Sequence, residues 1–186
     1  WLAPDSRIFG FDNTGKMYYV SPTGTGQVQL AGQIPGATSW TASAVMFQPG
    51  RILQMGGASS AAVVIDINGP QPVVTSTQAM STQRQWVSAT VLADGRVLGT
   101  GGSGVENQLT GVNNVAEIWN PATGQWTQGT AGVNARLYHS GALLLPDASV
   151  IILGGGAPGP LVNLNGEIYH PPYLSCGPGA FAPRPS

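Results

Sequence analysis

The chain has 186 residues, of which 42% are apolar, so its length and composition are sufficient for a sizeable hydrophobic core. Only 8% of the residues are charged, whereas an average soluble domain has roughly a quarter. The net charge is −1 and Lys16 is the only lysine, which excludes an electrostatic surface for nucleic acid or for an anionic membrane.

Residues 1–37 contain three short segments rich in β-branched and aromatic residues, at 7–11, 17–20 and 27–30. Glycine, proline, asparagine and threonine separate these segments, as is typical of turns between short strands. We therefore expect residues 1–37 to form part of a small antiparallel sheet.

One sequence pattern then occurs three times, over residues 41–57, 86–102 and 139–155. Each copy has a strand of small and β-branched residues, a tight turn, a returning strand and a pair of glycines. The first positions of the three copies are Thr41, Trp86 and His139, which stand 45 and then 53 residues apart. We expect these three residues to share one structural position, and we expect the function to depend on it.

Two further strands follow the second copy, at 116–121 and 125–127, with a turn between them. The first of these recurs after the third copy, at 166–171, and residues 64–68 are a looser counterpart after the first. Four strands in about 45 to 53 residues are typical of one blade of a kelch-type β-propeller. The predicted fold class is therefore all-β.

The repeat predicts a partial blade over 1–37, blades near 38–83, 84–135 and 136–175, and an exit linker over 176–186 that leads toward a C-terminal domain. An open arc of this kind would leave strand edges and apolar faces uncovered. We therefore expect the arc to belong to a larger, seven-bladed propeller. A small ring that closes on itself is the alternative.

Other classes of site are absent from the sequence. The longest apolar run is too short to span a bilayer, and no Ser-His-Asp order, phosphate loop or zinc cluster occurs. Cys176 is the only cysteine, so an internal disulfide is excluded. The low charge and the many Thr, Asn, Gln and Gly residues favour a secreted or cell-surface protein.

Three phrases stand out, at 136–147, which contains Arg-Leu-Tyr-His-Ser, at 116–124, and at 166–174, which ends in Pro-Pro-Tyr-Leu. They resemble the galactose oxidase and glyoxal oxidase family. The resemblance covers the chain from about Trp40 onward. It implies a kelch propeller followed by a C-terminal sandwich domain.

Members of this family are copper-radical oxidases, which oxidise a primary alcohol or aldehyde with dioxygen and release hydrogen peroxide. The resemblance implies that copper is held by an adjacent tyrosine and histidine, by a second tyrosine crosslinked to a cysteine, and by a histidine of the following domain. The adjacent pair corresponds to Tyr138 and His139. Tyr138 would be the axial tyrosine and the general base, and His139 a copper ligand.

The two positions of the crosslinked cofactor fall on Thr41 for the cysteine and on Trp86 for the tyrosine. Threonine has no sulfur and indole is not a phenol, so a Tyr-Cys thioether is not expected. Cys176 lies in the exit segment and does not replace the missing cysteine. Copper binding through Tyr138 and His139 alone would be weak, because tight sites have three or four protein ligands.

These observations favour a galactose-oxidase-like scaffold without the radical, which binds a glycan or a protein at the channel mouth. Trp86 with Trp40 would suit a sugar ring, and we expect the indole N–H of Trp86 to be hydrogen bonded. The alternative is a copper-dependent oxidase of primary alcohols or aldehydes. A third interpretation, a purely structural propeller, predicts neither metal nor glycan. The expected partners are the rest of the propeller and the sandwich domain.

Overall fold

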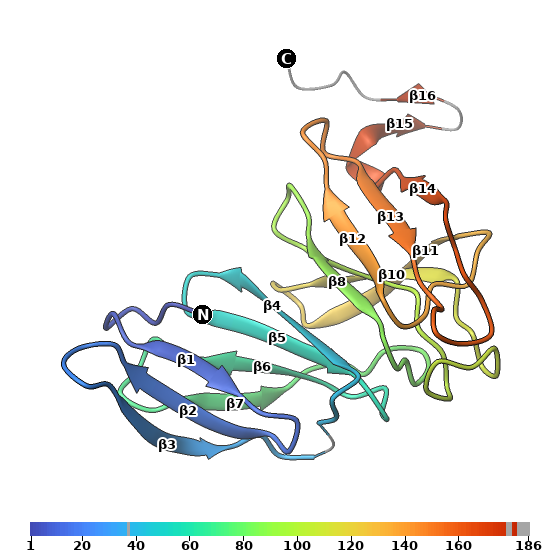
Figure 1. The fold of residues 1–186 in the computed structure, drawn as a ribbon. Coiled ribbons are helices and arrows are strands. Elements are labelled where there is room, and N and C mark those ends of the chain that lie inside the picture. The colour runs from blue at the N-terminus through green and yellow to red at the C-terminus, as the bar shows by residue number, and fades with distance from the viewer. Residues whose placement is uncertain (37, 178–179, 182–186) are drawn as a thin grey trace.

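The computed structural model describes residues 1–36, 38–177 and 180–181, and side-chain detail extends to Ser175. The chain is all-β, as the sequence predicts, and its sheets follow one another along an arc (Figure 1). The described part contains one short 3-10 helix, η1 (Pro172–Leu174), and no apolar helix long enough to cross a membrane.

Four antiparallel sheets form the body of the molecule, and the chain traverses each one strand at a time. The first sheet contains β1 (Ile8–Phe11), β2 (Lys16–Ser21) and β3 (Gln27–Gln33). The second contains β4 (Ala42–Gln48), β5 (Arg51–Gly56), β6 (Ala62–Asp66) and β7 (Val73–Ser76). The third contains β8 (Ser88–Val91), β9 (Val97–Thr100), β10 (Val115–Asn120) and β11 (Gln125–Ala131).

The fourth sheet contains β12 (Ser140–Leu144), β13 (Val150–Gly154) and β14 (Gly166–Tyr169). After η1, β15 (Ser175–Gly177) pairs with β16 (Ala180–Phe181) in a separate two-stranded sheet. The predicted division into blades and exit linker stays a prediction, and residues 178–179 and 182–186 of that linker lie outside the described residues.

Hairpin turns hold the first two strands of each repeat in register. In the third sheet, Asp94 Oδ1 accepts the backbone N–H of Arg96 at 3.1 Å, and Gly95 has a φ of +82°. The positive φ is accessible to glycine without a steric cost, so the turn brings Val91 opposite Val97. Asp147 forms the same turn in the fourth sheet, where its Oδ1 accepts the backbone N–H of Ser149 at 3.1 Å.

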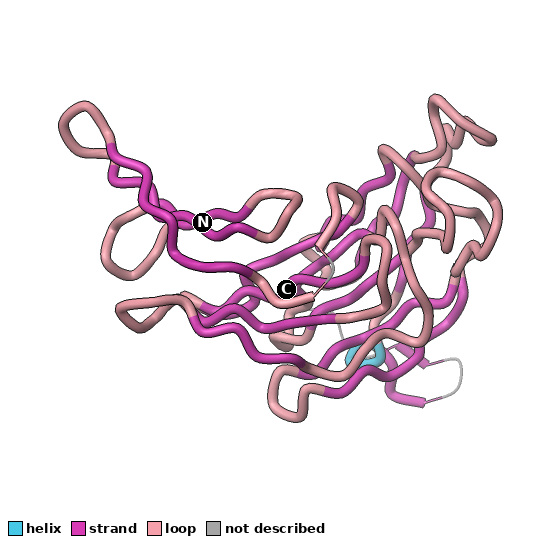
Figure 2. The backbone as a smooth tube through the Cα atoms, turned by 90° about the horizontal axis from the view of Figure 1, so that it is seen from below, coloured by secondary structure: helices cyan, strands magenta, loops and turns pink. Residues whose placement is uncertain are grey.

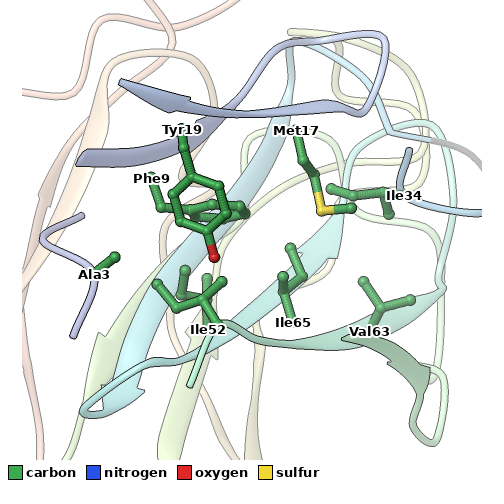
Figure 3. Close-up of a cluster of buried hydrophobic side chains, with 9 residues drawn as sticks. Ala3, Phe9, Met17, Tyr19, Ile34, Ile52, Val63 and Ile65 are labelled. Atoms are coloured by element: carbon green, nitrogen blue, oxygen red, sulfur yellow. The ribbon is translucent and has the colours of Figure 1, made fainter. Parts of the chain in front are cut away.

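Buried side chains form a separate core between each pair of neighbouring sheets. Figure 3 shows the first, where Phe9 and Tyr19 of the first sheet face Ile52 and Ile65 of the second. In the next core, Phe47 meets Trp119 of the third sheet edge-on, with ring centroids 4.9 Å apart. A third core joins the third and fourth sheets. This face-to-face stacking of successive sheets is the packing of propeller blades.

In the described part of the chain, the first and fourth sheets each have one apolar face that no other sheet covers. Figure 2 shows these two sheets on opposite sides of the molecule. Val28 and Leu30 of β3 are 71% and 61% exposed, and Leu143 of β12 is 64% exposed. Side chains of the same kind are buried where sheets meet. The arc therefore ends in surfaces suited to further packing.

Paired glycines join each sheet to the segment that begins the next. The N–H of Gly57 donates to the carbonyl of Arg84 at 2.8 Å, and the N–H of Gly102 donates to the carbonyl of Arg136 at 2.7 Å. A Cβ on Gly101 would lie 2.7 Å from that Arg136 carbonyl oxygen. Glycine is therefore required at this crossing because no side chain fits.

The same arginines bind the following sheet through their side chains. The Arg84 guanidinium donates to the carbonyls of Gly101 and Val115 and lies 2.8 Å from the Glu117 carboxylate, with both side chains buried. Burial lowers the pKa of Arg84, and the nearby Glu117 opposes that effect. Arg136 repeats the arrangement with Glu167 at 2.9 Å, where the carboxylate is 22% exposed.

We predict that Arg84→Ala will destabilise the chain far more than Arg136→Ala. The first variant leaves Glu117 as an unpaired buried charge, which costs about 3–5 kcal/mol. Glu167 can gain water in the second variant, so its cost should be smaller. Urea unfolding would measure the difference, with Arg96→Ala as control, because its exposed pair with Asp94 is worth roughly 0–1 kcal/mol. Equal losses for Arg84 and Arg136 would contradict this account.

We also predict an acid-sensitive contribution from Glu167. Burial alone would raise the pKa of this carboxyl, but hydrogen bonds from Val133, Arg136 and Asn134 outweigh it, so the pKa lies below the ordinary 4.5. The stabilisation is therefore present above pH 4.5 and is lost as the pH falls through the folded-state pKa. Glu167→Gln should remove it at neutral pH, and the variant's stability should depend less on pH below 4.5 than that of the wild type. Identical pH profiles would show that the carboxylate contributes nothing.

Candidate functional site at the starts of the inner strands

The three residues aligned by the repeat stand at the starts of three neighbouring strands. Thr41 directly precedes β4, Trp86 lies two residues before β8, and His139 directly precedes β12. These strands are the innermost of their sheets, and β8 contacts both β4 and β12. Figure 1 shows β8 and β12 side by side near the middle of the arc. The fold therefore brings together positions that are far apart in the sequence.

Two of these residues have an uncommon backbone conformation. Trp86 and His139 each have a φ of 63°, which is rare for a residue other than glycine. Such conformations persist only where the surrounding structure enforces them, and they are concentrated at functional sites. At Trp86 a restraint is visible, since its N–H donates to the carbonyl of Thr41 at 2.9 Å.

Four aromatic side chains form a continuous row across the starts of these strands. Trp40 and Trp86 meet edge-on with ring centroids 4.9 Å apart, and Trp86 and Tyr138 are 4.5 Å apart. Tyr138 stacks on His139 at 3.6 Å with an interplanar angle of 28°. Trp40 is 58% exposed and His139 is also exposed, so both ends of this aromatic row meet solvent.

The imidazole of His139 is oriented by a backbone carbonyl. Its Nδ1 lies 3.0 Å from the oxygen of Ala157. A carbonyl oxygen can only accept, so this hydrogen bond assigns the proton of the neutral ring to Nδ1. The lone pair of Nε2 is then directed away from that bond. This is the tautomer and the orientation of many metal-binding histidines.

The loop that supplies this carbonyl also fixes the backbone of Tyr138. The N–H of Gly156 donates to the Tyr138 carbonyl at 2.6 Å, with Gly156 at a φ of +97°. Asn107 from the loop after β9 donates to the carbonyl of Pro158 at 2.6 Å. Sequence reasoning missed Ala157 as a partner of His139. The available signal was the third glycine at 154–156, where the other two copies have only two.

Thr41 is a buried part of the structure. It is 1% exposed, and its hydroxyl lies 2.7 Å from Ser39 Oγ and donates to Gln85 Oε1 at 3.2 Å. The expectation for Trp86 was wrong in one respect, because its indole Nε1 is buried without a hydrogen-bond partner. The ring is held instead by Trp40 and Tyr138, and the N–H remains a donor without an acceptor.

A pocket of about 310 Å³ lies at the starts of these strands. Its walls include Thr41, Trp86 and His139. The structure thus brings three of the four predicted site residues onto one pocket, and Tyr138 contacts two of them through its ring. Within the described residues, no cluster of three or more His, Cys, Asp or Glu side chains could hold a metal ion. Tyr138 and His139 can supply two metal ligands, and a complete site requires others.

We predict that Thr41→Val will lower the free energy of unfolding by about 1–3 kcal/mol, because Gln85 loses a buried hydrogen-bond donor while side-chain volume is preserved. Chemical denaturation would measure it, with Thr123→Val at an exposed turn as the control. An unchanged stability for Thr41→Val would show that the hydroxyl network contributes nothing to folding.

No protein-family model matches the chain. Galactose oxidase sequences from Gibberella zeae are 29% identical over 190 residues, covering 90% of this chain. The chain spans only 28% of the length of these curated relatives.

Among solved structures, a fungal alcohol oxidase of the AA5 family in complex with copper superposes with a TM-score of 0.83 and 27% identity. The match covers 91% of this chain and 39% of that protein. YjhT matches with a TM-score of 0.63 at 16% identity, over 84% of this chain and 52% of its own, which supports the fold alone. Sequence and structure thus agree with the repeated phrases, and the chain is a propeller segment related to the galactose oxidase family.

Proposed function

We propose that the whole protein is a copper-dependent oxidase of primary alcohols or aldehydes. In this proposal the chain contributes Tyr138 and His139 as two copper ligands, and the aromatic row forms one wall of the substrate site. The observation that carries the proposal is the orientation of His139. Its Nδ1 is engaged by the Ala157 carbonyl, so Nε2 is available to a metal.

The donor set is chemically suitable for copper. Imidazole nitrogen and phenolate oxygen are both ligands of Cu(II), and the two come from adjacent residues whose rings are in contact. Copper bound there would supply one-electron oxidation chemistry. The remaining ligands would come from parts of the protein outside this chain, which spans less than a third of its curated relatives.

The side chains of this chain have separate tasks in the proposal. The phenolate oxygen of Tyr138 would accept the proton of the substrate alcohol, as a general base, and would become the phenol. Trp86 and the exposed Trp40 would position the carbon skeleton of the substrate by packing against its apolar face. The Ala157 carbonyl would keep His139 in one tautomer.

The crosslinked radical is a separate question. The assignment of Thr41 and Trp86 to the cysteine and tyrosine positions rests on the family resemblance, which the internal repeat supports at Thr41, and it stays a prediction. Neither side chain can form a Tyr-Cys thioether. A radical cofactor, if the enzyme uses one, must therefore be supplied by residues beyond this chain or by a different aromatic group.

A second candidate function is favoured by the exposure of Trp40. An indole that is 58% exposed and braced edge-on by Trp86 is a suitable platform for a sugar ring. In this alternative the protein is a glycan-binding scaffold without redox chemistry. Both candidates are consistent with a secreted or cell-surface protein that has further blades and a downstream sandwich domain.

The experiment is a copper titration of the full-length protein, followed by electron paramagnetic resonance and by a peroxide assay with simple alcohols and aldehydes. We expect one tightly bound Cu(II), and we expect His139→Ala to weaken binding at least tenfold and abolish peroxide release. His170→Ala is the matched control, since His170 is the other histidine of this chain.

Absence of stoichiometric copper, or equal effects of the two histidine variants, would overturn the oxidase proposal. Glycan binding by the copper-free protein that is lost in Trp40→Ala would then support the scaffold. If these variants lose neither peroxide release nor glycan binding, the function lies outside the aromatic row.

A further inference from the structure

Two loops from neighbouring sheets meet beside the candidate site. The β9–β10 loop, residues 101–114, belongs to the third sheet, and the β13–β14 loop, residues 155–165, belongs to the fourth. The β13–β14 loop supplies the Ala157 carbonyl that binds Nδ1 of His139. Asn107 of the β9–β10 loop is not among the residues that line the pocket at this site. Its contact with the other loop therefore needs an explanation other than direct participation in the pocket.

The contact is a hydrogen bond from the Asn107 side chain to the backbone of the other loop. Its Nδ2 donates to the carbonyl of Pro158 at 2.6 Å. A carbonyl oxygen can only accept, so the nitrogen end of the amide must face it. The Oδ1 of Asn107 is buried and has no partner among the described residues. The amide is thus oriented for the bond to Pro158 even though its acceptor remains unsatisfied.

The two loops also fit each other closely at this point. Asn107 has a φ of 47°, a left-handed conformation that asparagine adopts more readily than most residues. On the facing loop, a Cβ on Gly159 would clash with the Asn107 amide and would lie 2.5 Å from the carbonyl oxygen of Gly156. An asparagine on one loop and a glycine on the other are therefore both suited to the contact.

Fixing the Pro158 carbonyl also restricts the carbonyl that binds His139. Only the φ and ψ angles of Pro158 separate its carbonyl from that of Ala157, and the proline ring holds φ near about −65°. On the other side of Ala157, the N–H of Gly156 donates to the carbonyl of Tyr138 at 2.6 Å. The Ala157 carbonyl is therefore held from both directions, and Asn107 supplies one of the two restraints.

The base of the β9–β10 loop is attached to the segment that leads into Trp86. Ser103 is fully buried, and it exchanges two backbone hydrogen bonds with Gln85, of 2.8 and 3.1 Å. Gln85 Nε2 also donates to the carbonyl of Gly104 at 3.3 Å. Asn107 thus extends from a support next to Trp86 and reaches the loop that orients His139. The contact relates the positions of these two site residues to each other.

We propose that Asn107 is a positioning residue for the candidate metal site. By binding the Pro158 carbonyl, it keeps the Ala157 carbonyl on Nδ1 of His139 and so leaves Nε2 of that ring directed toward a metal. The proposal rests on the proposed function, in which His139 is a copper ligand. Asn107 is not itself a ligand, and it acts only through the β13–β14 loop.

Nuclear magnetic resonance of the copper-free, full-length protein with isotope-labelled histidine tests the first step, at a pH where the imidazole is neutral. The nitrogen chemical shifts distinguish the protonated from the unprotonated ring nitrogen, and His139→Ala identifies the signals of His139. We expect the proton on Nδ1 in the wild type. Asn107→Asp preserves the side-chain size but places a carboxylate against the Pro158 carbonyl, so we expect a mixture of tautomers. Gln108→Glu adds the same charge at the exposed neighbouring position and should leave the tautomer unchanged.

Copper titration of the wild type and of these two loop variants tests the second step. We expect Asn107→Asp to weaken Cu(II) binding by up to about tenfold, because direct outer-shell partners of metal ligands are worth about tenfold or more and Asn107 acts one residue further out. Gln108→Glu should bind copper as the wild type does. An unchanged tautomer in Asn107→Asp, or the same change in Gln108→Glu, would overturn the proposal. A changed tautomer with unchanged copper affinity would also overturn it.

Gly159→Ala disturbs the same contact from the other loop and provides an independent variant. We expect it to shift the tautomer of His139 in the same direction as Asn107→Asp, with a melting temperature close to that of the wild type. The wild-type tautomer in Gly159→Ala would contradict the proposal. If the wild-type protein binds no copper, the oxidase proposal fails, whereas the tautomer measurement on the copper-free protein decides the role of Asn107 independently.

Discussion

Two buried arginines, Arg84 and Arg136, couple the sheets of this chain to one another. The carbonyl of each accepts a hydrogen bond from the second glycine of the preceding sheet, and its guanidinium binds carbonyls and a glutamate of the following sheet. Each arginine thus connects two sheets, the preceding one through its backbone carbonyl and the following one through its side chain. Because the carbonyl approaches within 2.7 Å of where a Cβ would stand, the glycines and the arginines are required together. The hydrophobic cores supply most of the attraction between sheets, and these contacts determine where each sheet begins.

The candidate site depends on this coupling. Trp86 follows Arg84 by two residues and His139 follows Arg136 by three, so both stand where the chain leaves the arginine and turns into an inner strand. The turn requires a positive φ at both positions. Because each arginine is held by the sheet before it and by the sheet after it, the position of the aromatic row is restricted. This explains why positions separated by 45 and 53 residues in the sequence lie at the starts of neighbouring strands and share a pocket.

Most of the fold could be predicted from the repeat, because the hairpin turns, the double glycines and the short β-branched strands are local signals. The equivalence of Trp86 and His139 was also predictable, and their shared φ of 63° is consistent with it. The Arg84–Glu117 and Arg136–Glu167 pairs were not predicted, although all four residues recur in the repeat. Their role depends on burial, which sequence spacing does not reveal. The partner of His139 was missed for a related reason. Ala157 acts through its backbone carbonyl, which every residue type has, so the residue type does not indicate the contact.

The sequence by itself determined the class of the protein, an all-β propeller segment related to the galactose oxidase family, and it predicted that Tyr138 and His139 belong to the site. Local patterning is sufficient for such conclusions because strand, turn and ligand types are properties of single residues and their near neighbours. The tertiary structure alone decided that Trp40, Trp86, Tyr138 and His139 form one row and which tautomer of His139 is held. These features arise from contacts between sheets, where burial and backbone direction determine which groups meet.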